Sequence, residues 1–354
     1  MSSRLTISLA ALAANYQLLC DKAWGRVAGV VKADAYGLGA NTVVKRLLEE
    51  GCTEFFVASA AEGMVLRRAF ADVSIYVLEG ALPDNIDGLV TGQLVPVLNT
   101  LKQCQTWAST QLPAAVHIDT GLQRLGLNAQ QALELAATAP FPIVLGVSHF
   151  ANADDPGHIS VVNQLQQGIN AHQVFRTKNP GIRLSLCNSA GILGGLGPED
   201  LGRAGIALYG GNPYCDLPNP MQPVVKFEAR ILQQRKVSAG VPVGYGGTYI
   251  ATRASRLVIV SAGYADGVPR LLSNQGQVAI RGQKFPMVGR VSMDLLAVDA
   301  TGLAEGDLTE GGWVEILGAL ISVDDVAKQA QTIAYEVLCR LGTRAQRIYS
   351  TMPI

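Results

Sequence analysis

The sequence predicts an α/β fold, in which a (β/α)8 TIM barrel is followed by a C-terminal, mainly β domain. Up to about residue 210, apolar runs rich in β-branched residues alternate with segments of helical periodicity. Eight such runs can be counted, and eight units in this length fit a closed barrel better than an open doubly wound sheet. Beyond a proline-rich stretch, turns rather than helices separate the apolar runs, which indicates a β domain.

The expected barrel strands are nearly continuous apolar runs, which is typical of parallel strands covered on both faces. They are 27–32, 54–58, 74–78, 94–98, 114–118, 143–149, 183–187 and 203–208. Helical segments between them, with apolar residues three or four apart, include 41–50, 60–70, 129–137 and 158–175. Ahead of the first barrel strand, a short strand is expected to lead into a helix capped by Ser8.

A linker is indicated by three prolines and several Asn and Asp residues between Tyr209 and Pro220. We therefore expect the barrel over residues 1–215 and the β domain over residues 222–354. One helix of the second domain should begin at the capping box Ser322-x-x-Asp325 and run to about Leu341. The strands expected there are 227–232, 256–260, 277–280, 295–299 and 313–317.

The composition points to small molecules as partners. The 354 residues include 28 basic and 28 acidic side chains, so no bulk charge favours nucleic acid or an anionic membrane surface. The six cysteines form no C-x-x-C pair, and the four histidines lack metal-binding spacing. No signal peptide and no apolar run of about 18 residues are evident. We expect a cytoplasmic protein without a metal site.

Unusual side chains lie where barrel strands end, which is where the working groups of such barrels gather. Lys32 directly follows the first run, so its amine could react with an aldehyde, although strand-end lysines more often point into water. His149 could lie beside a ligand ring or be an ordinary interior histidine. The loops after strands seven and eight offer the Ser189 hydroxyl and the backbone of Gly205, which suit a phosphate dianion.

With Arg203 at the same mouth, these groups suggest pyridoxal phosphate, which needs an amine, a phosphate clamp and a partner for its ring nitrogen. Nucleotide binding is not expected, because the chain has neither a Walker A loop nor a complete G-x-G-x-x-G motif.

The segment 30–37, VVKADAYG, resembles the cofactor-lysine motif of the alanine racemases. Ordered matches to the same family continue through nearly the whole chain. They lie at 119–126, 148–151, 188–190, 203–210, 244–249, 263–267, 289–294 and 347–349.

The resemblance implies a homodimer with shared active sites that binds pyridoxal 5′-phosphate and acts on alanine. Lys32 would bind the cofactor covalently and serve as one base, and Tyr245, supplied by the partner subunit, would be the opposing base. Arg124 and the Met293 backbone N–H would position the substrate carboxylate, and Tyr264 would narrow the entrance. The cofactor would be held by Lys32, Tyr36, His149, Asn188, Ser189, Arg203, Gly205, Ile206 and Tyr349.

The sequence departs from the family pattern at His117. The family usually carries a lysine there, modified to a carbamate that anchors the substrate-binding arginine, and an imidazole cannot become that anion. Asp34 also stands where asparagine is common.

The leading interpretation is a racemase that interconverts L- and D-alanine, either supplying D-alanine for peptidoglycan or consuming it. A racemase of broader range that accepts serine remains open, as does a barrel-fold pyridoxal phosphate decarboxylase. The decarboxylase is disfavoured because no convincing cysteine and acid follow Tyr245. A non-enzymatic pyridoxal phosphate-binding protein would resemble the barrel alone, whereas here a further domain follows.

Overall fold

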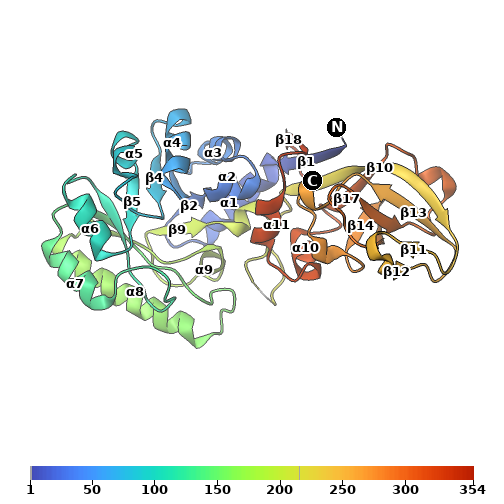
Figure 1. Cartoon of the computed structure of the whole chain (residues 1–354). Coiled ribbons are helices and arrows are strands. Elements are labelled where there is room, and N and C mark those ends of the chain that lie inside the picture. Colours follow the sequence, from blue (N-terminus) through green and yellow to red (C-terminus); the bar gives the residue numbers. More distant parts are fainter. Residues whose placement is uncertain (1, 215) are drawn as a thin grey trace. The chain divides into compact units, whose positions relative to one another are not determined.

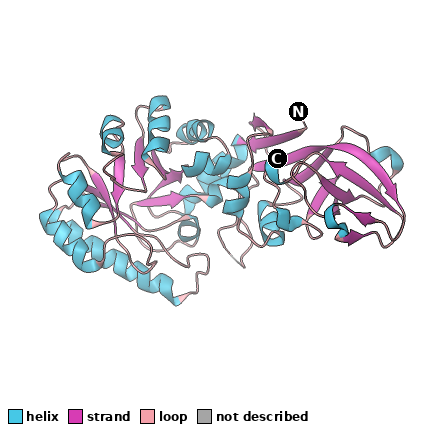
Figure 2. Cartoon of the chain, in the orientation of Figure 1, coloured by secondary structure: helices cyan, strands magenta, loops and turns pink. Residues whose placement is uncertain are grey.

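The computed structural model describes residues 2–214 and 216–354, which form two compact units. The barrel unit comprises Ala13–Leu208 and Asn212–Pro220. The β unit comprises the N-terminal segment up to Leu12, together with Tyr209–Gly211 and Met221–Ile354. Figure 1 labels the elements, and Figure 2 shows helices gathered around the strands of the barrel unit and mostly strands in the β unit.

The barrel unit contains a parallel sheet of eight strands in the order β8-β7-β6-β5-β4-β3-β2-β9. The ring is nearly closed between β8 and β9, because Asp200 N–H donates to the Leu184 carbonyl and Arg203 N–H to the Cys187 carbonyl, each at 2.9 Å. The predicted barrel is thus confirmed. Its strands are β2 (Arg26–Val30), β3 (Glu54–Val57), β4 (Ser74–Val77), β5 (Val95–Leu98), β6 (Ala114–His117), β7 (Ile143–Val147), β8 (Arg183–Ser185) and β9 (Leu201–Ala204).

Helices follow most of the barrel strands, and several begin at a polar capping residue. The side chains of Ser59, Thr100 and Asn128 each accept a hydrogen bond from the backbone N–H three residues later. The last expected strand was wrong in its position, since β9 ends at Ala204 and a 3-10 turn follows. The helices are α1 (Leu9–Lys22), α2 (Lys32–Gly37), α3 (Ala40–Glu49), α4 (Ala60–Ala69), α5 (Ile86–Thr91), α6 (Leu101–Ala108), α7 (Ala129–Thr138), α8 (Ile159–Lys178) and α9 (Ser189–Leu193).

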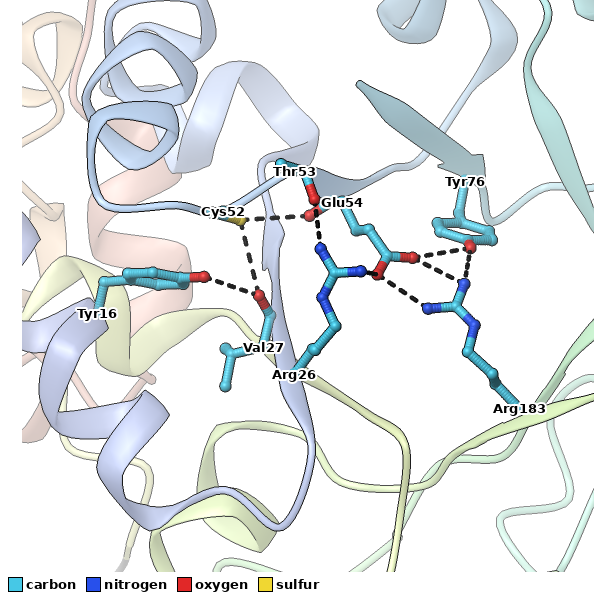
Figure 3. A network of polar contacts seen from close by, with 8 residues as sticks. All are labelled: Tyr16, Arg26, Val27, Cys52, Thr53, Glu54, Tyr76 and Arg183. Atoms are coloured by element: carbon cyan, nitrogen blue, oxygen red, sulfur yellow. Dashed lines mark hydrogen bonds and ion pairs between the residues drawn. The ribbon is translucent and has the colours of Figure 1, made fainter. Parts of the chain in front are cut away.

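A polar network at the amino ends of the barrel strands centres on the buried carboxylate of Glu54 (Figure 3). Arg183 donates to both of its oxygens, at 2.9 and 2.8 Å, and the Tyr76 hydroxyl donates at 3.0 Å. Arg26 adds an ion pair at 3.5 Å. Burial alone would raise the pKa of Glu54, but these bonds and charges lower it below its ordinary value. The network joins β3 to β8, which are not neighbours in the sheet.

Beside this network, the Val27 carbonyl of β2 accepts hydrogen bonds from two side chains (Figure 3). The Tyr16 hydroxyl of α1 donates at 3.0 Å, and the Cys52 thiol donates at 3.7 Å. The first barrel strand is therefore fixed to the helix that precedes it and to the loop before β3.

The β unit contains a second sheet of eight strands, almost all antiparallel. Its longest strand, β10, pairs with β17 on one side and with β13 on the other, so six of the strands form a closed ring. The strands are β1 (Ser3–Ser8), β10 (Val225–Val237), β13 (Ser255–Val260), β14 (Gln277–Ile280), β15 (Gln283–Val288), β16 (Leu296–Asp299), β17 (Trp313–Leu317) and β18 (Gln346–Ser350), with a separate pair β11 (Pro242–Val243) and β12 (Tyr249–Ile250). The two helices are α10 (Val323–Gln329) and α11 (Ala334–Arg340), and the 3-10 turns of the chain are η1 (Ile206–Tyr209), η2 (Tyr245–Gly247), η3 (Tyr264–Asp266), η4 (Arg270–Leu272) and η5 (Glu305–Asp307).

Two features of the β unit differ from the expectations. The N-terminal strand β1 pairs with β10 and β18, so it joins this unit although the sequence grouped residues 1–215 together. The capping box at Ser322 is present, but the single helix expected after it is two helices, with Gln331 between them at φ 53°. A left-handed residue at that point ends the regular helix.

No helix within the described ranges is long and apolar enough to cross a membrane. Among the cysteines, Cys20, Cys52, Cys104 and Cys187 are free thiols, whereas Cys215 lies outside the described residues.

We predict that Glu54→Gln lowers the free energy of unfolding by about 2 to 4 kcal/mol, because the change leaves the charge of Arg183 without its bidentate partner. Denaturant titration followed by fluorescence measures this loss. The control is Arg340→Met, which removes an exposed ion pair to Glu336 within α11 and should cost less than about 1 kcal/mol. Equal losses in the two variants would contradict the assigned role of the network.

Candidate active site

Lys32 lies at the carboxyl end of the first barrel strand, directly before a turn of unusual handedness. The four residues Ala33–Tyr36 all have φ between 53° and 56°, so the start of α2 is a left-handed turn without any glycine. Such a conformation costs roughly 1 to 2 kcal/mol for each L-residue. The surrounding contacts must therefore hold this turn in place.

Two carboxylates hold the left-handed turn. Glu62, in the first turn of α4, accepts hydrogen bonds from the backbone N–H groups of Ala33 at 2.8 Å and Ala58 at 2.7 Å. Asp34 lies within the turn, and its Oδ1 accepts from the N–H of Ala40 at 2.8 Å, where α3 begins. Aspartate and asparagine tolerate the left-handed conformation better than other non-glycine residues, which suits position 34.

At the other end of the same turn, the hydroxyls of Tyr36 and Ser189 lie close to Gly205. The hydroxyl of Ser189 accepts hydrogen bonds from the N–H groups of Gly205 at 2.9 Å and Ala207 at 3.3 Å. A Cβ atom at position 205 would lie only 2.6 Å from the Tyr36 hydroxyl and 3.9 Å from the Ser189 hydroxyl. Glycine is thus required for space, and the two hydroxyls and the backbone N–H groups form a small polar cradle.

The guanidinium of Arg203 is buried inside the barrel beside this cradle. Its Nη1 donates to the Ser185 carbonyl at 2.9 Å and to the Ser185 hydroxyl at 2.6 Å. Its Nη2 donates to the carbonyls of Ser148 and Leu186, at 2.6 and 3.3 Å, and to His149 Nδ1 at 3.2 Å. Within the described part of the chain, Nε has no hydrogen-bond partner. Arg203 therefore keeps one donor for a ligand.

The hydrogen bond from Arg203 fixes which ring nitrogen of His149 carries the proton. Because Nδ1 accepts that bond, the neutral ring carries its proton on Nε2. Burial and the positive charge of Arg203 lower the pKa of His149 to about 3, and the charges of Arg124 and Lys32 act in the same direction. His149 is thus a neutral imidazole near pH 7.

His117, the last residue of β6, is a second buried and neutral imidazole. Its Nδ1 lies 2.8 Å from Asn99 Oδ1, while the Asn99 amide nitrogen donates to the Leu78 and Val97 carbonyls. The amide orientation is therefore fixed, so Nδ1 is the donor and Nε2 is left as an acceptor. Burial and the charges of Arg203 and Arg124 lower the pKa of His117 to about 4.

Arg124 lies exposed on the loop after β6, and this loop is held at its base. Leu127 bonds back to the backbone of His117 and Asp119, at 2.8 and 3.0 Å. The Asp119 carboxylate accepts from three backbone N–H groups within the loop, at positions 121–123. The loop that carries Arg124 is consequently compact, with its first residues next to His117.

The β unit carries the remaining predicted residues. Tyr245 begins η2, is 72% exposed, and borders a hollow of about 440 Å³ that is also lined by Arg290 and Ser292. Tyr264 N–H donates to the Ser292 carbonyl at 3.0 Å, which brings η3 against the loop that carries Met293. Tyr349 lies in β18. Tyr245, Tyr264 and Met293 all present exposed side chains.

The structure therefore divides the predicted residues into two groups, each within one unit. One group lies on the barrel unit and comprises Lys32, Tyr36, Arg124, His149, Asn188, Ser189, Arg203, Gly205 and Ile206. The other lies on the β unit and comprises Tyr245, Tyr264, Met293 and Tyr349. Asn188 is the N-cap of α9, with its Oδ1 accepting from Gly191 N–H at 3.0 Å.

Three supporting residues were missed by sequence reasoning. Glu62 holds the turn after Lys32, Asn99 orients His117, and buried Glu199 accepts from the N–H groups of Leu186 and Cys187 behind Arg203. Only Glu62 had a signal, because Ser59-x-x-Glu62 has the spacing of a capping box. The Glu62 carboxylate instead bonds to Ala58 and Ala33, so even that signal would have given the wrong partner.

Comparison with known proteins agrees with this division into two units. The family model for the alanine racemase N-terminal domain matches residues 7–213, and the model for the C-terminal domain matches residues 224–349. The chain belongs to the alanine racemase family. The expected isomerase family is thereby confirmed, as is the expected combination of a barrel with a C-terminal β domain.

Relatives in this family match over nearly their full length. The "Alanine racemase, catabolic" of Rhizobium johnstonii is 44% identical, covering 98% of this chain and 94% of its own. The alanine racemase of Rhodospirillum rubrum is 42% identical, with coverages of 98% and 95%. The crystal structure of alanine racemase from Bartonella henselae, which has covalently bound pyridoxal phosphate, is 37% identical with a TM-score of 0.91, covering 99% of this chain and all of its own.

We predict that His117→Gln makes this alanine racemase family member less sensitive to acid. The unfolded chain protonates His117 near pH 6.5 and the folded protein only near pH 4, so between these values the unfolded state binds more protons. The stabilisation from the neutral imidazole is complete above pH 6.5 and is lost as the pH falls toward 4. Glutamine can still donate to Asn99 but does not titrate.

Melting temperatures measured from about pH 7 to about pH 4.5 test this, and the wild-type curve should fall more steeply than that of His117→Gln. Parallel curves for wild type and His117→Gln would show that His117 is not buried as a neutral ring.

Proposed function

We propose that this protein interconverts L- and D-alanine with pyridoxal 5′-phosphate, using Lys32 and Tyr245 as bases on opposite faces of the reacting carbon. The observation that carries the proposal is the convergence at one barrel mouth of Lys32, the spare Nε donor of Arg203, and the polar cradle around Gly205. Family membership supports it, because the relatives described above are named alanine racemases.

The residues present fit the cofactor. The Gly205 cradle would offer the Tyr36 and Ser189 hydroxyls to a phosphate, together with the Gly205 N–H once it exchanges its bond to Ser189 for one to the phosphate, and the Nε–H of Arg203 would offer one donor to a ring nitrogen. When bound, pyridoxal phosphate makes the α-hydrogen of an attached amino acid acidic by withdrawing electrons. Arg203 keeps its proton because guanidinium is so weakly acidic, so it would donate a hydrogen bond to the ring nitrogen without protonating it. His149, neutral and bonded to Arg203, would lie beside the ring.

Racemisation needs one group to take the proton from one face and another to return a proton to the opposite face. Lys32 Nζ would do this on the barrel side, and the hydroxyl of Tyr245 of the partner subunit would do it on the other. The exposed Tyr245 and the hollow beside it are features of a surface that a second copy of the chain would cover. We therefore propose a homodimer in which each active site takes residues from both subunits.

Further residues of the two units would bind the substrate and shape its access. Arg124 carries a full positive charge on a compact loop and, with the Met293 backbone N–H, would hold the substrate carboxylate. Asn188, Ile206 and Tyr349 would complete the phosphate site, and Tyr264 would narrow the entrance. Of the two cellular roles, supply of D-alanine for peptidoglycan and its breakdown, the name of the Rhizobium johnstonii relative favours breakdown.

Chiral chromatography after incubation of the purified protein with L-alanine tests the activity directly, with formation of D-alanine as the expected result. Parallel incubations with L-serine measure substrate breadth, and incubation with a diamino acid detects release of carbon dioxide. Carbon dioxide without D-alanine would favour a decarboxylase and refute the racemase.

We predict that Gly205→Ala weakens pyridoxal phosphate binding by about tenfold or more, because the new methyl group would occupy the position 2.6 Å from the Tyr36 hydroxyl. Absorbance titration of the cofactor-free protein gives the dissociation constant. Gly88→Ala is the matched control, since a Cβ there meets nothing within 4 Å and should leave binding unchanged. Wild-type affinity in Gly205→Ala would remove the cradle from the cofactor site.

We predict that Tyr245→Phe retains the cofactor but loses most turnover, and that exchange of the α-hydrogen with deuterated water is lost first from one enantiomer. Phenylalanine keeps the ring but has no hydroxyl to move a proton. Proton NMR of L- and D-alanine incubated separately measures the exchange. Lys32→Ala serves for comparison and should give no cofactor bound covalently by mass spectrometry. Normal exchange from both enantiomers in Tyr245→Phe would refute the two-base assignment.

A further inference from the structure

We propose that Glu62 is a positioning residue for Lys32: its carboxylate ties the backbone N–H groups of Ala33 and Ala58 together and so holds the left-handed turn between Lys32 and Tyr36. The proposal rests on the proposed function in one respect, namely that Lys32 is the reactive amine. Glu62 itself touches neither Lys32 Nζ nor the cradle in the hydrogen bonds described above.

The carboxylate joins the ends of two neighbouring barrel strands. Ala33 follows β2 and Ala58 follows β3, and these strands pair through Val30 and Phe56. The ladder ends one step later, where Val31 N–H donates to the Phe56 carbonyl at 2.9 Å. Beyond that bond, the two oxygens of Glu62 continue the connection by accepting one N–H from each chain. The turn after Lys32 is thereby attached to β3 and α4.

This attachment matters because the turn contains no residue that favours it except Asp34. Ala33, Ala35 and Tyr36 adopt φ values that L-residues rarely adopt, so other contacts must compensate for the strain. A carboxylate that accepts two backbone N–H groups is a strong and rigid compensating contact. A side chain with a single acceptor could satisfy only one of the two.

The turn also sets the distance between two groups of the proposed cofactor site. Lys32 stands immediately before it, and Tyr36 is its last left-handed residue, with its hydroxyl packed against Gly205. If the turn relaxed to right-handed backbone, the amine and the hydroxyl would change their separation. Glu62 thus positions both the group that would bind the cofactor aldehyde and one that would bind its phosphate.

An ordinary structural role for Glu62 would be to cap α4. The spacing Ser59-x-x-Glu62 is that of a capping box, in which the glutamate side chain bonds to the N–H of the capping serine. Here Ser59 Oγ does accept from Glu62 N–H, at 3.3 Å, but the Glu62 carboxylate is directed to Ala58 and Ala33. Only the bond to Ala58 supports the helix entry, and the bond to Ala33 serves the turn.

The test compares Glu62→Gln and Glu62→Asp with the matched control Glu79→Gln. Glu79 also accepts a backbone N–H at the start of α4, from Ala60 at 2.8 Å, but has no bond to the turn. Glutamine at 62 keeps one acceptor and loses the other, whereas glutamine at 79 keeps the single acceptor it needs. Aspartate at 62 keeps the charge but is too short to span both N–H groups.

Three readouts are measured on the full-length protein: hydrogen exchange of the segment 31–40 without cofactor, visible circular dichroism of bound pyridoxal phosphate, and kcat with KM for alanine. We expect both Glu62 variants to exchange this segment about tenfold faster, alter the dichroism, and lower kcat about tenfold with a smaller change in KM. Glu79→Gln should match the wild type in all three readouts.

Several results would overturn the proposal. Wild-type exchange in Glu62→Gln would show that the carboxylate does not hold the turn, even in a fully active enzyme. Faster exchange with unchanged dichroism and kcat would reduce Glu62 to a structural role. Wild-type behaviour of Glu62→Asp would show that charge rather than the two-point attachment matters. Absence of cofactor and of racemisation in the wild type would refute the proposed function instead, and the exchange data would still decide whether Glu62 holds the turn.

Discussion

Arg203 carries its positive charge inside the barrel, where carbonyl groups, a hydroxyl and an imidazole accept its hydrogen bonds and no carboxylate of the described chain does so. Burial lowers its pKa, and the charge of Glu199 partly offsets that effect. Burial lowers the pKa of His149 and of His117, and the charge of Arg203 acts in the same direction, so both rings are neutral. Because the Nη atoms are fully engaged, the direction of Nε is fixed before any ligand binds. One buried cation therefore helps to keep the two neighbouring imidazoles neutral and fixes the position of its own spare donor.

The left-handed turn after Lys32 shows why such a site is hard to derive from sequence. The expectation that Lys32 ends the first strand needed only the apolar run before it. The turn carries no glycine before position 37, and alanine is the residue most typical of right-handed helix. One carboxylate that supports it in our proposal is Glu62, which lies 30 positions from Lys32 in the chain and bonds to backbone rather than to a side chain. Local propensity cannot report a contact of that kind.

The same contrast between local sequence pattern and contacts between distant residues explains which other parts of the fold could be predicted. Seven of the eight barrel strands were predictable in position because they coincide with buried, mostly apolar runs between helical segments, and this pattern is local; the eighth, β9, begins two residues before the expected strand. The N-terminal strand β1 was expected as a strand, but its partners β10 and β18 lie more than 200 positions away in the sequence. Strand β18, Gln346–Ser350, is largely polar and was missed, because pairing with β1 rather than its own sequence makes it a strand. Candidate site residues could be proposed where a motif marked them, whereas Asn99 and Glu199 act through hydrogen bonds that leave no local pattern in the sequence.

His117 affects the net charge that the barrel mouth presents to an anionic ligand. Held by Asn99 as a neutral ring, it gives the mouth a hydrogen-bond acceptor without adding a negative charge. The Asp119 carboxylate is engaged with backbone N–H groups of its own loop. The positive charges of Arg124 and Arg203 are therefore not cancelled by an ion pair with either residue. A phosphate and an amino-acid carboxylate are the complementary charges, and an electrostatic field of this sign raises the local concentration of such ligands. In the proposed racemase, an imidazole rather than an anion at position 117 would leave more of the charge of Arg124 for the substrate carboxylate.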